Sequence, residues 1–223
     1  MKDPMLKQSS TEETWRIFRI MAEFVEGFET LSRAGPCLTI FGSARTSDNH
    51  DAYKLAESTA RLAAEKGYGV ITGGGPGIME AANKGAAEGG GNSIGLNIQL
   101  PYEQVPNEHI TTMINFRYFF IRKVMFLKYT SAVIVMPGGF GTLDEMFETL
   151  TLIQTHKISY LPLILMGVDF WQGLLDWLRT RALTSDYIVE EDIGLMTVTD
   201  SPHKAIDTIS SFYRKRESDK NFL

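Results

Sequence analysis

Three glycines, a threonine and two acidic residues stand close together in the sequence PGGFGTLDE, at residues 137–145. The segment 131–136 just before it is apolar and rich in β-branched residues, which is typical of a buried strand. After the motif, apolar residues recur at helical spacing. The motif is therefore predicted to join a strand to a helix through a glycine turn. Backbone N–H groups and the helix dipole at such a turn favour a phosphate.

The predicted phosphate ligands of this turn are three glycines and one hydroxyl group. They are Gly138, Gly139, Gly141 and Thr142. Carboxylates follow within about two helical turns at Asp144, Glu145 and Glu148, where the sugar of a bound nucleotide could lie. Carboxylates are also common in the first turn of any helix, because they complement its dipole. We favour a catalytic role for Glu145 and a solvated position for Glu148.

Another glycine turn, TGGGPGIME at residues 72–80, is the first of the two along the chain, and it also follows a predicted strand and opens a helix. Its glycines Gly74 and Gly75 are predicted to contribute to nucleotide binding. Glu80 is a second candidate catalytic carboxylate, and the favourable interaction with the helix dipole is again the alternative explanation.

Two further turns leave predicted strands at residues 42–45 and 97–101, and they add Ser43 and Asn97 as candidate nucleotide ligands. None of these turns has the sequence G-x-G-x-x-G or G-x-x-x-x-G-K-[ST]. A standard dinucleotide-binding fold and a nucleoside triphosphatase are therefore disfavoured. A mononucleotide held between two glycine turns fits the sequence better.

Arg122 and Lys123 interrupt a strongly apolar segment, residues 118–127. On a helix, the neighbours of Arg122 at three- and four-residue spacing are aromatic or apolar. A guanidinium in such surroundings requires an anionic partner, since an unpaired buried charge is costly. A structural ion pair is one alternative, and a side chain that reaches water is another. The nearby phosphate turn favours Arg122 as a catalytic or binding residue, with Lys123 as a further phosphate ligand.

The composition excludes several other classes of protein. The 223 residues are 43% hydrophobic, which is enough for one full core. The net charge of −5 gives no reason to expect a nucleic-acid partner. No apolar run approaches the roughly 20 residues that span a bilayer, and no signal peptide is recognisable, so we expect a cytoplasmic protein without a membrane partner. Cys37 is the only cysteine and the four histidines lack ligand spacing, so no metal site is expected.

Strand and helix patterns alternate along most of the chain. The predicted strands are 38–41, 69–72, 93–97, 110–114, 132–136, 162–166 and 196–198. The predicted helices are 11–31, 51–66, 77–88, 117–129, 142–154, 170–181 and 202–215. This alternation predicts a Rossmann-like, doubly wound α/β fold with a mainly parallel sheet and helices on both faces. An amphipathic helix extension (residues 1–34) would precede a single nucleotide-binding domain (35–223).

These motifs, in this order, resemble those of the LONELY GUY family of cytokinin riboside 5′-monophosphate phosphoribohydrolases, many of whose members are labelled lysine decarboxylases. Residues 137–145 match the family signature PGGxGTxxE, and Arg122-Lys123 matches the pair that precedes it. Residues 73–80 match the first glycine turn. The resemblance spans about residues 36–216. The N-terminal helix and the turn at 41–45 are similar to the longer bacterial branch, which leaves the natural base open.

The resemblance implies hydrolysis of the N-glycosidic bond of a nucleoside 5′-monophosphate, AMP or N6-substituted AMP, to the free base and ribose 5-phosphate. It also implies that Arg122 and Glu145 are essential. The carboxylate would stabilise an oxocarbenium-like ribose while water attacks. Glu80 would assist, and no cofactor would be needed.

Three rival functions are open. A pyridoxal-phosphate lysine decarboxylase would need a Schiff-base lysine, for which only Lys123 could be suggested. A non-catalytic nucleotide sensor or carrier could use the same fold. A purely structural oligomer would leave both glycine turns unexplained.

The family resemblance implies a dimer as the basic unit, with active sites near the subunit boundary. The sequence gives a separate reason to expect self-association. The N-terminal helix carries a long apolar stripe from Ile17 to Leu31. That stripe must be buried against its own domain or against a second copy.

Overall fold

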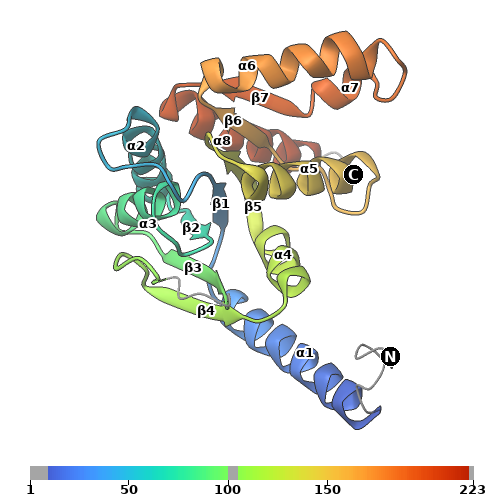
Figure 1. The fold of residues 1–223 in the computed structure, drawn as a ribbon. Helices are drawn as coiled ribbons and strands as arrows, with labels where there is room; N and C mark the ends of the chain where they lie inside the picture. Colours follow the sequence, from blue (N-terminus) through green and yellow to red (C-terminus); the bar gives the residue numbers. More distant parts are fainter. Residues whose placement is uncertain (1–9, 100–104, 221–223) are drawn as a thin grey trace.

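The computed structural model describes residues 10–99 and 105–220. Within them, one sheet of seven parallel strands has the order β4-β3-β2-β1-β5-β6-β7, with helices on both sides (Figure 1). The strands are β1 (Cys37–Phe41), β2 (Gly69–Thr72), β3 (Ser93–Ile98), β4 (Thr112–Phe116), β5 (Thr130–Val135), β6 (Leu163–Met166) and β7 (Met196–Thr199). The helices are α1 (Ser10–Leu31), α2 (Asp51–Glu65), α3 (Ile78–Glu88), α4 (Phe119–Lys128), α5 (Phe140–Gln154), α6 (Val168–Trp177), α7 (Glu190–Ile193) and α8 (Pro202–Lys220), and a π-helix (Leu178–Leu183) continues α6.

The strand order reverses at β1, the centre of the sheet. β1 pairs with β2 on one side and with β5 on the other, and all three run parallel. Sheets of this kind bind ligands beyond the carboxyl ends of the strands, at the point where the order reverses. The turns after β1, β2 and β5 meet at that point.

Two hydrophobic layers cover the sheet, as the doubly wound prediction requires. Leu38 and Ile40 of β1 pack with α2, α3 and α8. Cys37 and Phe41 of the same strand face the opposite layer, formed by α4, α5, α6 and the end of α1. Successive side chains of a strand point to opposite faces of the sheet, so each central strand contributes side chains to both layers. The predicted fold class is confirmed.

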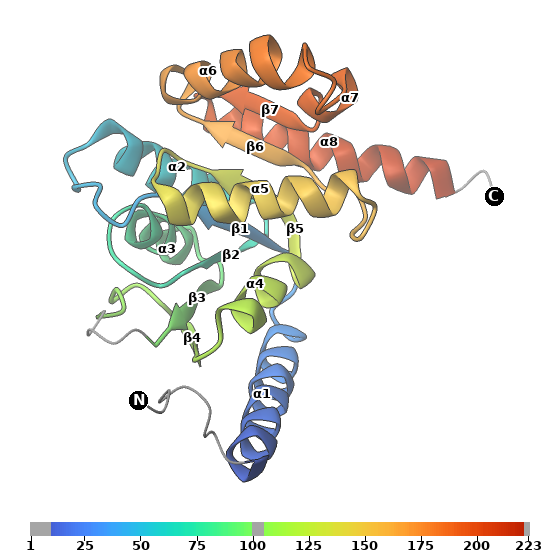
Figure 2. The same ribbon diagram turned by 45° about the vertical axis from the view of Figure 1, so that its right-hand side comes forward.

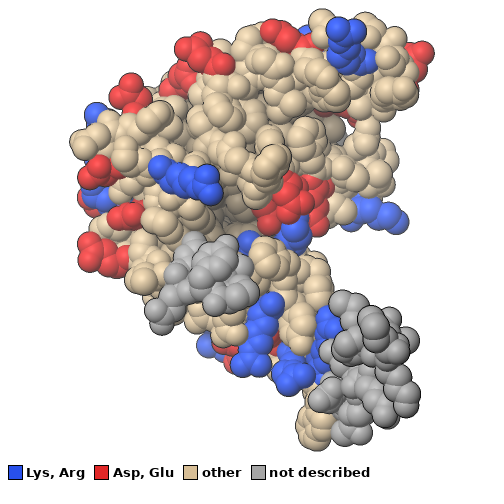
Figure 3. All heavy atoms as spheres, in the orientation of Figure 1, with Lys and Arg blue, Asp and Glu red and all other residues tan. Residues whose placement is uncertain are grey.

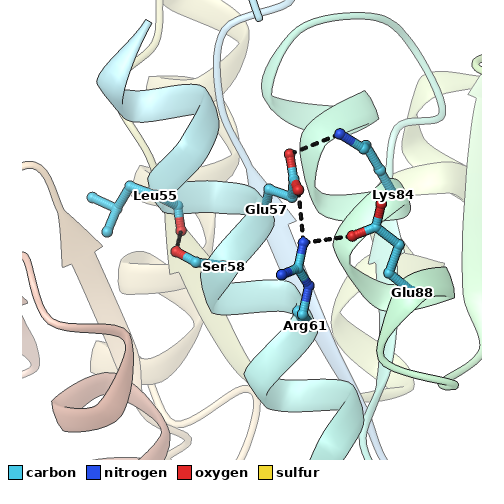
Figure 4. Close-up of polar contacts among 6 residues, drawn as sticks. All are labelled: Leu55, Glu57, Ser58, Arg61, Lys84 and Glu88. Atoms are coloured by element: carbon cyan, nitrogen blue, oxygen red, sulfur yellow. Dashed lines mark hydrogen bonds and ion pairs between the residues drawn. The ribbon is translucent and has the colours of Figure 1, made fainter. Parts of the chain in front are cut away.

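α2 and α3 pack unusually closely. Alanines line their contact, and a Cβ added to Gly85 would lie 2.1 Å from the Glu57 carbonyl oxygen, so only glycine fits. Arg61 and Glu57 of α2 form ion pairs with Glu88 and Lys84 of α3 (Figure 4). This contact fixes α3, whose amino-terminal end carries the first glycine turn.

α1 extends away from the sheet in two views (Figures 1 and 2). One side of α1 is anchored: Leu31 is buried, the Arg16 guanidinium lies 5.6 Å from the centroid of the Tyr118 ring, and both carboxylate oxygens of Glu23 accept from the Arg117 backbone N–H at 3.1 and 3.2 Å. A Cβ on Gly27 would meet the Met125 side chain of α4 at 2.8 Å. The division of the chain at residue 34 stays a prediction.

Several element boundaries differ from the predicted ones. β4 begins at Thr112 instead of residue 110, because Ile110 packs its side chain against Gly74 and Gly95. α5 begins at Phe140, two residues early, because glycines at the turn do not prevent helical conformation there. α7 was not predicted, since four residues are too few for a periodic pattern. No helix in the described part of the chain is long and apolar enough to cross a membrane.

Candidate active site

A cavity of about 770 Å³ opens at the carboxyl ends of the central strands. Its wall comes from the turn after β1 (residues 41–45), from the whole of residues 139–145, and from Arg122 of α4. Gly73 of the first glycine turn also lines it. The cavity therefore lies where the strand order predicts a ligand site.

Backbone hydrogen bonds hold these turns together. The Ser43 N–H donates to the Pro137 carbonyl oxygen at 3.0 Å, and the Ile78 N–H donates to the Ser43 carbonyl oxygen at 3.0 Å. Ser43, a predicted ligand, thus lies between the two glycine turns and lines the cavity. Gly77 has a φ of 70°, and a Cβ there would lie 2.5 Å from the Ser43 oxygen. Only glycine allows the turns to approach so closely.

The glycine turn after β5, residues 137–142, is the predicted anion site. Gly139 is the N-cap of α5 and no side chain caps this helix, so its first N–H groups have no intrahelical partner. Gly139, Gly141 and Thr142 all line the cavity. Gly138 does not line it, and a Cβ there would lie 2.1 Å from the Thr142 hydroxyl. Gly138 therefore leaves room for Thr142.

Glu145 lies in the second turn of α5 with 6% of its surface exposed. Burial raises its pKa to about 7, although the charges of Lys123 and Arg122 lower it in part. Its Oε1 lies 3.7 Å from the Lys123 ammonium, and its buried Oε2 has no hydrogen-bond partner among the described residues. A carboxylate with a pKa near neutrality is suited to exchange a proton with substrate or water.

Lys123 lies beside the cavity, within a cluster of carboxylates. Its ammonium lies 2.7 Å from Asp144 Oδ2 and 2.6 Å from Glu148 Oε2, in addition to its contact with Glu145. Acidic side chains gather next to a basic one between α5 and α4 (Figure 3). Burial alone would lower the pKa of Lys123, but its carboxylate partners raise it. The carboxylates therefore stabilise the charged form of Lys123. Glu148, which was expected to be solvated, is part of this ion-pair cluster.

Arg122 reaches the cavity from α4. Its guanidinium lies over the rings of Phe119 and Phe126, with centroid distances of 5.2 and 5.4 Å. Burial lowers its pKa, although the charges of Glu145 and Asp144 raise it in part. Its buried Nε has no hydrogen-bond partner among the described residues. Within the described part of the chain, Arg122 and Glu145 thus have one buried donor and one buried acceptor without partners, and both oppositely charged side chains line the same cavity.

Sequence reasoning missed the side chains that hold the first glycine turn. The Asn107 amide donates to the carbonyl oxygens of Gly74 at 3.2 Å and Gly75 at 3.0 Å, and to Asn83 Oδ1 at 3.0 Å. Asn83 also accepts from the Thr72 hydroxyl. Gly74 and Gly75 are buried and do not line the cavity. The sequence signal that could have pointed to Asn83 is a single asparagine among the alanines of α3.

Glu80 and Asn97 are not brought to the cavity wall, although their neighbours Met79 and Ile98 are. The charge of Glu80 acts on Tyr53 of α2, whose pKa is raised first by burial and then by this carboxylate. The Asn97 amide donates to Asn115 Oδ1 at 3.0 Å, while its buried Oδ1 has no partner among the described residues. Residues 100 and 101 of its turn lie outside the described part of the chain.

The cavity also has lining residues that were not predicted. Arg45 adds a cation from the turn after β1, and Phe119 and Phe126 add aromatic surface. A second cavity of about 490 Å³, near α7, has neither glycine turn in its wall. Among the residues that the structure describes, no group of three or more histidine, cysteine or acidic side chains is placed to hold a metal ion.

Several known proteins are similar to this chain in sequence. A family model described as "possible lysine decarboxylase" matches residues 79–209, more than half of the chain. A cytokinin riboside 5′-monophosphate phosphoribohydrolase of Mycobacterium tuberculosis is 29% identical over 160 residues, which cover 69% of this chain and 82% of that protein. The chain belongs to the LONELY GUY family. The resemblance predicted from the sequence is thus confirmed.

Other relatives differ from this chain in length, and their names give different substrates. A probable cytokinin riboside 5′-monophosphate phosphoribohydrolase of rice is 32% identical over 50% of this chain and 46% of its own. A pyrimidine/purine nucleotide 5′-monophosphate nucleosidase of Escherichia coli is 30% identical over 54% of this chain and 29% of its own. This chain thus matches less than half of either protein. Nucleotide hydrolases are therefore established among its relatives.

The fold also occurs in proteins described as carriers or binders of the molybdenum cofactor. The molybdenum cofactor carrier protein of Chlamydomonas reinhardtii superposes with a TM-score of 0.59 at 22% identity, covering 80% of this chain and 98% of that one. A molybdenum cofactor binding protein of Rippkaea orientalis gives a TM-score of 0.57 at 23% identity, covering 80% and 96%. At this identity the likeness shows the fold alone.

Proposed function

We propose that this protein hydrolyses the N-glycosidic bond of a nucleoside 5′-monophosphate, with AMP or an N6-substituted AMP as substrate. The observation that carries the proposal is the pair of unpartnered buried atoms, Arg122 Nε and Glu145 Oε2, beside the uncapped glycine turn. A substrate with an anionic group and ribose hydroxyls would supply the missing partners. The names of the relatives in rice, Mycobacterium tuberculosis and Escherichia coli support the same chemistry.

The reaction replaces one bond at the anomeric carbon. Water adds to C1′ of the ribose, the bond from C1′ to the base nitrogen breaks, and the base leaves with a proton. Positive charge develops on the ribose as this bond lengthens, and the Glu145 carboxylate would stabilise it. With a pKa of about 7, Glu145 could also accept the proton of the attacking water.

The remaining residues would bind and orient the nucleotide. The 5′-phosphate would lie at the N–H groups of Gly139, Gly141 and Thr142, where the helix dipole favours an anion. Arg122 would hold the phosphate or the ribose, and its contacts with two aromatic rings restrict its guanidinium to one position. Fixing the sugar against Glu145 contributes to the rate through orientation. Glu80 does not line the cavity and would assist only at a distance, behind Met79, which does line it.

A lysine decarboxylase mechanism finds little support in this cavity. A Schiff-base lysine must be neutral to attack a carbonyl group. Lys123 is held by three carboxylates that favour its ammonium form. None of the described residues lining the cavity is a lysine.

The proposal is tested with a panel of purine and pyrimidine nucleoside monophosphates, without added metal, and chromatographic detection of the released base. We expect base and ribose 5-phosphate in equal amounts, and Glu145→Gln as a matched control should release both at least about a hundredfold more slowly. A folded protein that binds a mononucleotide but releases no base from any member of the panel would instead be a carrier or sensor.

We also propose that the protein is a homo-oligomer, at least a dimer. The apolar stripe of α1 was expected to lie against its own domain or against a second copy. In the described structure most of it remains exposed, including Phe18, Met21 and Val25. Light scattering on the full chain tests this, and a strictly monomeric protein would contradict it.

A further inference from the structure

The structure changes which cation is available to bind the 5′-phosphate. Lys123 was expected to be a phosphate ligand, but its ammonium lies 2.7 Å from Asp144 Oδ2 and 2.6 Å from Glu148 Oε2. It also does not line the cavity. Among the described residues that do, the cationic side chains are Arg45 and Arg122. These two arginines are therefore the candidates for the phosphate.

Arg122 lies beside the first glycine turn. A Cβ built on Gly73 would be 3.8 Å from Arg122 Nη1, and the guanidinium lies over the rings of Phe119 and Phe126. Its charge acts on Glu145, the carboxylate that would face the anomeric carbon. Arg122 is thus placed to contact the ribose next to Glu145.

Arg45 belongs to the turn after β1, which is bonded directly to the turn after β5. The Ser43 N–H donates to the Pro137 carbonyl oxygen at 3.0 Å, and the Arg45 N–H donates to Ser43 Oγ at 3.1 Å. The Arg45 side chain is exposed, lines the cavity and makes no ion pair or hydrogen bond with any residue in the described part of the chain. Its guanidinium is therefore available to an anion at the neighbouring glycine turn.

The phosphate requires a further cation of this kind. A phosphate monoester carries about −1.5 to −2 charges at pH 7, whereas the N-terminus of α5 supplies only about +0.5. Asp144, two residues after Thr142, also lines the cavity, and the Lys123 ammonium pairs with this carboxylate. About one positive charge is therefore missing at the turn, and a guanidinium can supply it through two parallel hydrogen bonds to phosphate oxygens.

We propose that Arg45 binds the 5′-phosphate of the substrate and makes the site select nucleoside 5′-monophosphates over nucleosides. This inference rests on the proposed nucleotide hydrolysis and specifies how the phosphate is recognised. Arg45 contacts the phosphate oxygens that the N–H groups of Gly139, Gly141 and Thr142 leave free. The alternative is an exposed arginine that contacts only water, and its replacement would change the turnover of no substrate.

Kinetics with AMP and adenosine test the proposal. Arg45→Gln should lower kcat/KM for AMP about tenfold to a hundredfold, because a charge-assisted contact with the phosphate is lost. The same variant should leave kcat/KM for adenosine unchanged. Arg45→Lys keeps the charge without the planar fork and should give an intermediate value. An equal loss for both substrates, or no loss for AMP, would overturn the assignment.

Lys54→Gln is the matched control. Lys54 is an exposed cation of α2 that does not line the cavity, so its replacement removes the same charge from the surface. It should leave kcat/KM for AMP at the wild-type value. A loss as large as that of Arg45→Gln would mean that the overall charge of the protein, and not a contact of Arg45, accounts for the effect.

Inhibition of AMP hydrolysis gives a second measure. Ribose 5-phosphate carries the phosphate, whereas adenosine lacks it. Arg45→Gln should raise the inhibition constant of ribose 5-phosphate about tenfold or more and leave that of adenosine unchanged. An unchanged constant for ribose 5-phosphate would contradict the proposal.

Calorimetry separates this inference from the proposed function. A wild-type protein that binds AMP but releases no base defeats the hydrolase proposal. Arg45→Gln should even then bind AMP about tenfold more weakly, with the affinity for adenosine unchanged. Equal affinity of wild type and Arg45→Gln for AMP defeats the Arg45 assignment, whether or not the protein is a hydrolase. A folded wild-type protein that binds no mononucleotide defeats both.

Discussion

Replacing Lys123 with methionine should change the pH at which the enzyme becomes active. The ammonium of Lys123 lies 3.7 Å from Glu145 Oε1 and lowers the pKa of that carboxyl group more than the Arg122 guanidinium does. Methionine keeps the length and apolar character of the stem but removes the charge. The pKa of Glu145 should therefore rise above its present value of about 7.

The size of this rise follows from the geometry. Two unit charges 3.7 Å apart at an effective dielectric constant of about 20 interact by roughly 4.5 kcal/mol, or about three pKa units. This is an upper bound, because Asp144 and Glu148 share the same ammonium. A rise of only one unit, to about 8, would reduce the ionised fraction of Glu145 at pH 7 from about one half to one tenth. The expected loss in kcat/KM at pH 7 is then about fivefold.

The assay is kcat/KM for AMP between pH 5.5 and 9.5. In the wild type it should rise with pH through about 7, because the ionised carboxylate is the active form. In Lys123→Met the same rise should occur at least one unit higher, and the two profiles should converge near pH 9.5. Lys123→Arg keeps the charge and should retain most of the wild-type profile.

Lys84→Met is the matched control, since Lys84 forms an ion pair with Glu57 on the far side of the sheet. Its pH profile should equal that of the wild type. A loss of activity in Lys123→Met that is the same at every pH would refute the reasoning. It would indicate instead that Lys123 binds the phosphate directly, as its place in the motif first suggested.

Four further outcomes are expected. Arg122→Ala should lower kcat/KM at least about a hundredfold with the melting temperature within a few degrees of wild type, and near-normal turnover would remove it from the mechanism. Glu145→Gln should lose activity to a similar degree yet be more stable than wild type at pH 8. The raised pKa means that ionising this buried carboxylate costs folding free energy progressively between pH 4.5 and 7, so the gain should disappear in melts at pH 4. Adenosine should show both lower kcat and higher KM than AMP if the turn binds the 5′-phosphate, and equal kcat/KM for the two would argue against it. Gly138→Ala should weaken AMP binding at least tenfold in calorimetry, because its Cβ would displace Thr142, and unchanged affinity would contradict this.

Much of the sheet was accessible from the sequence because its strands are short, apolar and bounded by glycines. The strand at β5 and the turn after it were predictable together, since each fixes the position of the other. Arg122 could be chosen because a buried charge in apolar surroundings needs an anionic partner, and Glu145 because it follows a glycine turn at the carboxyl end of a strand. The structure brings both to one cavity, although their catalytic roles stay predictions.

Contacts between distant elements could not be read from local patterns. Lys123 was assigned to the phosphate because nothing in the sequence shows that α4 faces the acidic side of α5. The Asn107 amide reaches a turn more than thirty residues earlier, and no periodicity encodes that distance. Glu80 follows its glycine turn as Glu145 does, yet it does not line the cavity, and its charge acts on Tyr53 of α2. The rotation of each helix about its own axis determines which of its side chains reach a distant element, and local sequence patterns do not specify that rotation.

The central position of β1 has a consequence for how the protein is made. β1 pairs with β2 soon after β2 is synthesised, but its other edge waits for β5: the Thr39 N–H donates to the Thr130 hydroxyl across 91 residues of chain. At about 5–20 residues per second, that edge remains without its partner for roughly 5–20 s during translation. An unpaired strand edge is a template for wrong pairing. The chain is therefore most exposed to aggregation before residue 130 emerges, and no nucleotide can stabilise it then, because residues 139–145 of the cavity wall have not yet been synthesised.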